Sequence, residues 1–345
     1  MTTHPVLQET RSSSRRWRIW SIALVAAFLL SYCALSAPPP ARAASLETIG
    51  LTSSYYIDAA MASMNGGNLD TTFSQLGTAE ANRDNSAAAA RGACTNGQYT
   101  IYAIIDMGQP FSDHVYTWAG SNPSWGSVEL IALSYAKSWY NTSYNCFRMH
   151  LTIGVNNQVC YNWSSTNNTD PCVTGAGNAL AQYVEAANSN LASSGDSWQI
   201  DVSGGVDAET DAGWGSYSTT LGFINAYTAK INTYAAKYQL YDFGDATHSC
   251  SLDWSCDPTG QVYNIAWNIG YDYPFPEAYS TGQNSQWLEV SQYSSSNPIR
   301  YRAALMDDSQ TWCTTVYACW QDFAVKNGAW IEGGVLAGSG QEPLG

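Results

Sequence analysis

The sequence is poor in charge, and most of the charge that it has is negative. Only 12% of its 345 residues are charged, and 28 acidic against 14 basic residues give a formal net charge of −14. A surface this acidic repels a phosphate backbone, which argues against nucleic acid as a partner. Hydrophobic residues nevertheless make up 45% of the chain, which excludes a disordered protein and supplies a large core.

Several motifs that carry chemistry are also missing. No Gly-x-Ser-x-Gly occurs, which argues against a serine hydrolase. No Gly-rich phosphate loop follows the first predicted strand, which disfavours a nucleotide-binding open sheet. There is no Cys-x-x-Cys pair, and His114, His150 and His248 stand far apart in sequence. We therefore predict neither a metal site nor a cofactor.

Residues 1–43 are typical of an export signal. A basic stretch at residues 11–18 precedes an apolar run at residues 22–30, and Ala41-Arg42-Ala43 matches a cleavage site. The apolar run is short for a membrane span, so we expect a secreted bacterial protein without a stable span after cleavage. Arg15-Arg16 leaves the choice open between the general and the twin-arginine export route.

The nine cysteines include Cys33, which lies inside the predicted export signal. Tyr32 stands where a lipoprotein signal has a small residue, which disfavours a lipid anchor at Cys33. The other eight are an even number in an exported chain and predict structural disulfides. Many connectivities are open to eight cysteines. Proximity in sequence favours the pairs Cys94–Cys146, Cys160–Cys172, Cys250–Cys256 and Cys313–Cys319.

Strands and helices alternate from residue 99 onward. Strands are predicted at residues 99–106, 147–155, 198–209, 238–244, 262–267 and 299–306, with a short one within 274–279. Helices are predicted at residues 128–140, capped by Ser127, and at 180–191, 219–234 and 285–290. This alternation predicts an α/β fold, a single parallel (β/α)8 TIM barrel, regular or irregular, with disulfide-stapled loops. The barrel domain would cover residues 99–345. Residues 44–98 would be a lead-in segment with one helix at 54–64 and no clear strand.

Two carboxylates end the most apolar of these strands. Asp207 and Glu209 stand two residues apart, so both project from one face of the strand, together with Ser203 and Gly205. The carboxyl ends of barrel strands form the active-site mouth. Two acids packed there repel each other, which raises one pKa and makes that group a proton donor. The pair predicts acid–base cleavage of a glycosidic bond. Asp106, at the end of the first barrel strand, is a further candidate because an uncharged run, Ala103-Ile104-Ile105, precedes it.

Other polar and aromatic side chains fall at or after predicted strand ends. Aromatic rings stack on sugars, but they also fill cores, and a lone acid often closes a turn or caps a helix. The candidates for substrate binding are Asn156, Tyr241, Asp245, Trp267, Glu277 and Tyr279.

At these residues the sequence resembles known families. Asp106 and Asp207-Ala208-Glu209 are similar to the pattern of family 25 glycoside hydrolases, which are secreted lysozyme-like muramidases with a β/α barrel. The sequence resembles uncharacterised secreted actinobacterial proteins more closely, through residues 105–110, 153–157, 207–209, 243–246 and 274–287. Two muramidase tryptophans are missing, because Met107-Gly108-Gln109 replaces a Trp-Gln and Ser291 precedes Gln-Tyr-Ser.

The resemblance implies that Glu209 is the general acid, that Asp207 stabilises positive charge or orients an N-acetyl group, and that Asp106 positions the substrate. The leading hypothesis is a secreted, monomeric glycoside hydrolase acting on an extracellular polysaccharide or peptidoglycan. The missing tryptophans motivate the alternative, a non-catalytic glycan-binding module on a degenerate barrel. A structural envelope protein is a weaker third hypothesis, because it gives no reason for acids at strand ends.

Overall fold

The computed structural model describes residues 53–91, 94, 99–161, 170–305, 313 and 316–328. The predicted export signal and Cys33 lie outside these residues. None of the described helices is both long enough and apolar enough to cross a membrane.

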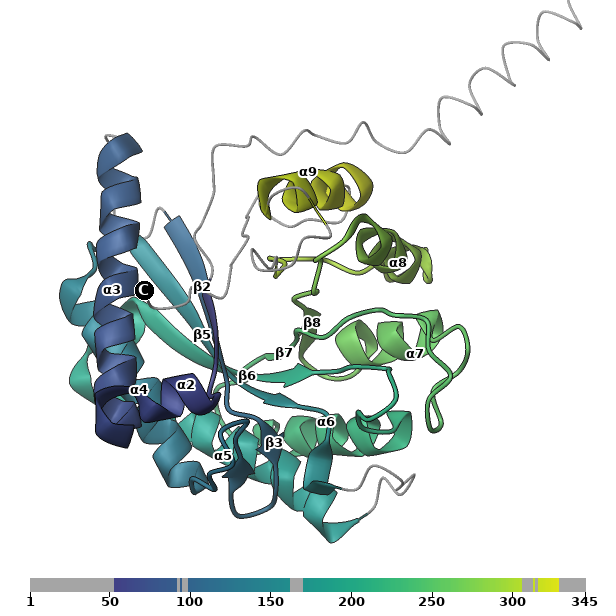
Figure 1. Cartoon of the computed structure of the whole chain (residues 1–345), viewed down its shortest axis with the longest axis horizontal. Coiled ribbons are helices and arrows are strands. Elements are labelled where there is room, and N and C mark those ends of the chain that lie inside the picture. Colours follow the sequence, from purple (N-terminus) through teal and green to yellow (C-terminus); the bar gives the residue numbers. More distant parts are fainter. Residues whose placement is uncertain are drawn as a thin grey trace, which may run out of the picture. The chain divides into compact units, whose positions relative to one another are not determined.

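Six parallel strands form one sheet in the order in which they occur along the chain. They are β1 (Ser53–Tyr56), β2 (Tyr99–Asp106), β5 (Phe147–Asn156), β6 (Ile200–Asp207), β7 (Leu240–Asp242) and β8 (Asp272–Pro274). The order never reverses, as it would in a doubly wound sheet, and Figure 1 shows β2 to β8 following one another. An isolated parallel bridge from Glu277 to Leu305 extends the series. The chain is therefore an α/β protein with the singly wound parallel sheet of TIM barrels.

The sheet curves around an aromatic interior. The ring centroid of Tyr102 on β2 lies 6.1 Å from that of Tyr241 on β7 and 5.4 Å from that of Phe275. Because β5 and β6 separate β2 from β7 in the sheet, these contacts require a closed or strongly curved sheet. The remaining buried members of this interior are Ile104, Phe243, Ala303 and Leu305.

Helices follow most strands and cover the outer face of the sheet through a second, larger core. They are α2 (Ala59–Ser63), α3 (Leu69–Arg91), α4 (Trp125–Thr142), α5 (Pro171–Ser194), α6 (Tyr217–Ile231), α7 (Thr259–Tyr263), α8 (Thr281–Gln292) and α9 (Val316–Asn327). A short antiparallel pair, β3 (Gln109–Pro110) and β4 (Val115–Tyr116), lies in the loop after β2. Pro171 at the first position of α5 and left-handed Gly195 at its end show why that helix begins and stops there.

The cap predicted for α4 is wrong by one turn. Ser124, not Ser127, is the N-cap, and its hydroxyl accepts a hydrogen bond from the Ser127 amide. The helix therefore starts one turn earlier and buries Trp125 as well.

The strand predicted at residues 262–267 is also wrong. These residues form the end of α7 and a π-helical turn, Asn264–Asn268. Val262, Ile265 and Ala266 are buried at helical spacing, and an apolar run this short does not reveal its period in the sequence. The strand predicted at residues 299–306 is reduced to isolated bridges at Tyr301 and Leu305, and Met306 lies outside the described residues.

The segment before residue 99 contributes to both the sheet and the core. It was predicted to hold no strand, which is wrong, because β1 pairs with β2 in parallel from Ser53 to Tyr56. The predicted helix at 54–64 shrinks to α2. The following helix, α3, packs closely on α4: a Cβ placed on Gly77 would lie 2.2 Å from the carbonyl oxygen of Tyr135.

The four predicted disulfides are confirmed. Cys94 pairs with Cys146, Cys160 with Cys172, Cys250 with Cys256 and Cys313 with Cys319. Three of them close loops of 12 residues or fewer, while Cys94–Cys146 spans 52 residues and joins the segment after α3 to the residue before β5. Four disulfides are expected of a protein that folds in an oxidising compartment.

Candidate active site

Five acidic side chains gather at the carboxyl ends of the strands. We call them the acid cluster: Asp106, Asp207, Glu209, Asp245 and Glu277. Asp106 ends β2 and Asp207 ends β6, while the other three follow β6, β7 and β8. All five are buried, with at most 9% of each residue exposed. Within the part of the chain that the structure describes, none of them forms an ion pair with a lysine, arginine or histidine.

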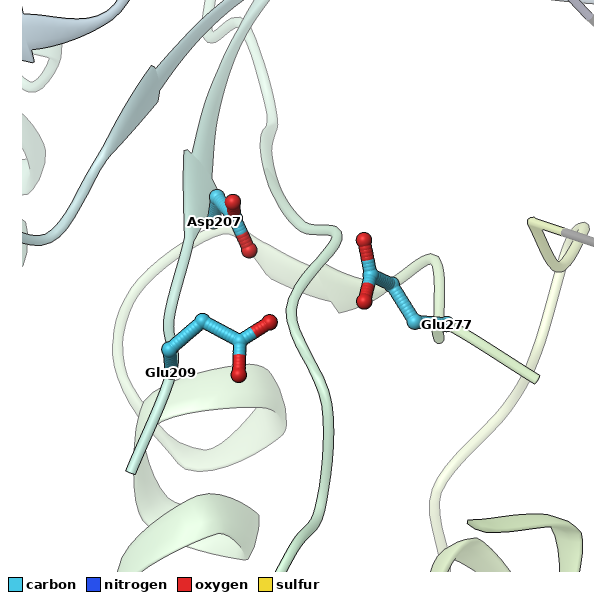
Figure 2. Close-up of side chains that lie close together, drawn as sticks. All are labelled: Asp207, Glu209 and Glu277. Carbon is cyan, nitrogen blue, oxygen red and sulfur yellow. The ribbon is translucent and has the colours of Figure 1, made fainter. Parts of the chain in front are cut away.

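Three members of the acid cluster form its centre. Carboxylate oxygens of Asp207, Glu209 and Glu277 all lie within 4.8 Å of one another. Figure 2 shows the three carboxyl groups turned toward one another, with Glu277 facing the other two. Asp207 Oδ1 is buried and has no hydrogen-bond partner among the residues that the structure describes, whereas Glu277 accepts a 2.6 Å hydrogen bond from the hydroxyl of Tyr279.

Burial and mutual repulsion raise the pKa values of this centre. The pKa of Asp207 is well above its usual value, through burial first and then the charge of Glu277. The pKa of Glu209 is raised in the same way, through burial and then Asp245. Burial raises the pKa of Glu277 to about 8 against the opposing hydrogen bond from Tyr279. The centre therefore retains protons at neutral pH, which is what a proton donor requires.

Glu209 is placed to carry such a proton. Burial raises the pKa of Glu209, and the nearby charges of Asp245, Asp207 and Glu277 add to that rise. Asp245 is fixed in turn by Thr247, whose amide and hydroxyl both donate to it.

Asp106 sits beside this centre in a more polar setting. Its carboxylate accepts hydrogen bonds from the Gly108 amide at 2.9 Å and from the indole Nε1 of Trp118 at 3.2 Å. Burial raises the pKa of Asp106 to about 6, and both hydrogen bonds oppose that rise. Asp106 therefore ionises at lower pH than Glu277, whose pKa is about 8.

Tyr241 and Trp267, two of the predicted substrate-binding residues, lie away from the acid cluster. Asn156, a third, is next to Asp207 in the β5–β6 register; it is buried like the acids, and its Oδ1 accepts a hydrogen bond from the Gln158 amide. Tyr241 is fully buried in the barrel interior and donates to Gln239. Trp267 is on the π-helical turn and packs edge-on against Tyr273 at 5.3 Å, because the predicted strand there is a helix. The other three, Asp245, Glu277 and Tyr279, lie at the mouth.

Three residues near the acid cluster were not among the predicted site residues. Tyr56 ends β1, and the pKa of its hydroxyl is raised by burial and then by the charges of Glu277, Asp207, Asp106 and Glu209. Trp118 and Trp214 lie in the loops after β2 and β6 with their ring centroids 6.1 Å apart. The one signal that could have found the tryptophans is that each stands within two residues of a glycine in a loop after a strand.

The central three carboxylates could also hold a hard divalent cation. Calcium and magnesium take carboxylate oxygens, and three converging oxygens supply half of an octahedral set. No metal site was predicted because the prediction considered only the spacing of histidines and cysteines, whereas these ligands are carboxylates at the ends of two strands, β6 and β8.

Comparison with known proteins leaves the function open. No protein-family model and no curated protein matches this sequence. Three solved structures are similar at 9% identity. A homocysteine methyltransferase from Escherichia coli aligns over 89% of this chain and 95% of its own (TM-score 0.44). A broad-specificity endoglucanase from an uncultured bacterium aligns over 88% of this chain and 89% of its own (TM-score 0.45). A 2,3-dimethylmalate lyase aligns over 87% of this chain and 79% of its own (TM-score 0.39).

Proposed function

We propose that the protein is a secreted glycoside hydrolase that cleaves a cell-wall or other extracellular glycan at the acid cluster. The observation that carries the proposal is the convergence of Asp207, Glu209 and Glu277, buried and without a cationic partner among the described residues. Such a group stores a proton at neutral pH, and glycosidic bonds are cleaved by a carboxylic acid that acts beside a carboxylate.

In the proposed reaction, Glu209 gives its proton to the glycosidic oxygen as the bond to the anomeric carbon breaks. Asp207 stabilises the positive charge that develops on the sugar ring, and Asp106 holds the substrate. Glu277, whose carboxyl group converges on those of Asp207 and Glu209, adds its charge to burial in raising their pKa values and so helps to keep a proton on this centre. A water molecule then adds its oxygen to the anomeric carbon and returns a proton to the carboxylate of Glu209.

The spacing of the carboxyl groups supports retention of configuration. Inverting enzymes leave roughly 6.5–9.5 Å between the two groups for a water molecule, whereas retaining enzymes have about 5–5.5 Å. One carboxylate oxygen of Asp207 and one of Glu209 lie within 4.8 Å of each other, which favours the closer spacing of retaining enzymes. Proton NMR of the first product released would show the retained anomer.

The test is a hydrolysis screen over neutral, acidic and amino-sugar glycans, with Glu209→Gln beside the wild-type protein. The variant keeps the shape but cannot release a proton, so turnover should fall ~10²–10⁴-fold. Glu129→Gln, on the outer helix α4, is the matched control and should leave turnover unchanged. An undiminished rate in Glu209→Gln contradicts the assignment. Glycan binding without hydrolysis by the wild-type protein would identify the binding module instead.

A further inference from the structure

We propose that Trp118 and Trp214 form a stacking subsite at the mouth of the barrel for a pyranose ring that bears no negative charge. The inference deepens the proposed function, since it names the class of sugar that the acid cluster admits. It rests on an aromatic pair that the proposed chemistry does not use.

The two rings form a corner at the edge of the acid cluster. Their centroids are 6.1 Å apart and their planes meet at 68°, which is an edge-to-face arrangement. Trp118 is 42% exposed although its Nε1 is bound to the buried carboxylate of Asp106. A large part of this side chain is therefore open to solvent within one hydrogen bond of the acid cluster. Sugar rings stack on aromatic ring faces through their C–H bonds.

Hydrogen bonds and close backbone packing hold the loops that carry the two tryptophans in place. In the turn that carries Trp118, the Gly120 amide donates a hydrogen bond to the Thr117 carbonyl. The Ala119 amide donates to the carbonyl of Ile57, the residue that follows β1. Next to Trp214, the Gly213 carbonyl accepts from Gln158 at 2.9 Å. On the other side, a Cβ on Gly215 would lie 1.8 Å from the Asn157 carbonyl, so only glycine fits there. A fixed platform loses little conformational entropy when it binds a ligand.

The charge beside the platform selects the sugar. Asp106, which binds Trp118, is ionised at neutral pH because its pKa is about 6. None of the five carboxyl groups at this mouth is paired with a cation among the described residues. A uronic acid or a lactyl-substituted sugar would bring another carboxylate next to the charge of Asp106, where burial strengthens the repulsion. Neutral hydroxyls and protonated amines instead donate hydrogen bonds to carboxylates. The subsite therefore fits neutral hexoses, N-acetylhexosamines or free amino sugars.

Calorimetric titration of the protein carrying Glu209→Gln with cellohexaose, chitohexaose and hexagalacturonate tests the proposal. At least one of the two neutral oligomers should bind, and hexagalacturonate should bind at least tenfold more weakly. Trp118→Ala and Trp214→Ala should each weaken binding of the neutral oligomer about tenfold, as expected for one lost stacking contact. Trp118→Phe keeps a ring face and should lose less.

Trp198→Ala is the matched control. Trp198 is 43% exposed, packs edge-on against Tyr140 at 6.4 Å and donates to its hydroxyl, but it precedes β6 at the opposite end of the sheet. Its loss should leave binding unchanged. Equal affinity in all the tryptophan variants, equal binding of hexagalacturonate, or no binding of any oligomer would overturn the subsite. Hydrolysis that survives Trp118→Ala and Trp214→Ala at unchanged KM would overturn the subsite alone. Tryptophan-dependent binding without hydrolysis would overturn only the proposed function.

Discussion

Trp118 donates its indole N–H to the carboxylate of Asp106, which stands 12 residues earlier in the chain, at a distance of 3.2 Å. This hydrogen bond joins the exposed aromatic corner to the acid cluster, and it opposes the rise that burial imposes on the pKa of Asp106. One side chain thus contributes both to the surface that meets the sugar and to the ionisation of a buried acid.

Trp118→Phe should raise the pKa of Asp106 above about 6, because the ring remains while the hydrogen bond is lost. If ionised Asp106 holds the substrate, the acidic limb of the pH–rate profile should move up by roughly half to one pH unit. The profile of kcat/KM against pH measures this directly. Trp198→Phe serves as the control, and an acidic limb that stays in place in Trp118→Phe argues against the role of Asp106.

If the proposed function holds, hydrolysis by the wild-type protein should be fastest between about pH 6 and about pH 8. Below the lower value Asp106, whose pKa is about 6, becomes protonated and loses its negative charge. Above the upper value the Asp207–Glu209–Glu277 centre begins to lose its shared proton, since the pKa of Glu277 is about 8. The limits belong to the coupled group rather than to single residues. Activity that peaks below pH 5 would show that the centre is ionised there and cannot donate a proton.

Asp84 should make the fold less stable as the pH rises. It lies in α3, is 1% exposed and accepts from the indole Nε1 of Trp139 at 2.9 Å. Burial, followed by the charge of Glu80, raises its pKa to about 8. The folded protein therefore holds this proton more tightly than the unfolded chain. The resulting stability is complete below the unfolded pKa of about 4 and is lost as the pH rises toward about 8.

Asp84→Asn keeps an oxygen for Trp139 but does not titrate. The wild-type protein should lose unfolding free energy between pH 5 and pH 7, and in Asp84→Asn this loss should be smaller by up to about 3 kcal/mol. Urea denaturation at the two pH values measures it, with Asp70→Asn at the exposed start of α3 as the control. An identical pH dependence in Asp84→Asn would show that Asp84 is ionised in the folded protein.

Gly77→Ala should destabilise the protein by about 1–3 kcal/mol, because the added methyl group meets the backbone of Tyr135 on α4, which cannot rotate away. Gly126→Ala is the helix control, since a Cβ there meets nothing nearer than 3.8 Å. That change should be neutral or slightly stabilising. Thermal denaturation compares the two. Tolerance of Gly77→Ala would mean that α3 does not pack closely against α4.

Most of the barrel could be predicted from the sequence because its central strands are apolar on both faces. The residues of β2, β5 and β6 form continuous buried runs, and the acids that end β2 and β6 interrupt them visibly. The disulfide pairs were predictable for a related reason, since three of the four close short loops.

The remaining features depend on tertiary contacts that leave no local pattern. The four residues of β1, Ser-Ser-Tyr-Tyr, become a strand only through pairing with β2. Trp118 and Trp214 stand 96 residues apart and meet only because the loops after β2 and β6 open at the same mouth. The strand predicted at residues 262–267 was wrong because a short apolar run fits a strand and a helix equally well.

The most direct test of the account compares aryl glycosides of the sugar that the hydrolysis screen identifies. A dinitrophenolate leaving group needs no proton, whereas a poor leaving group does. Glu209→Gln should therefore slow hydrolysis of the poor leaving group ~10²–10⁴-fold and that of the dinitrophenyl glycoside only slightly. Asp207→Asn should slow both, because charge on the sugar ring develops in either case. Equal losses for both substrates in Glu209→Gln, or no loss for either, would contradict the assignment of Glu209 as the general acid.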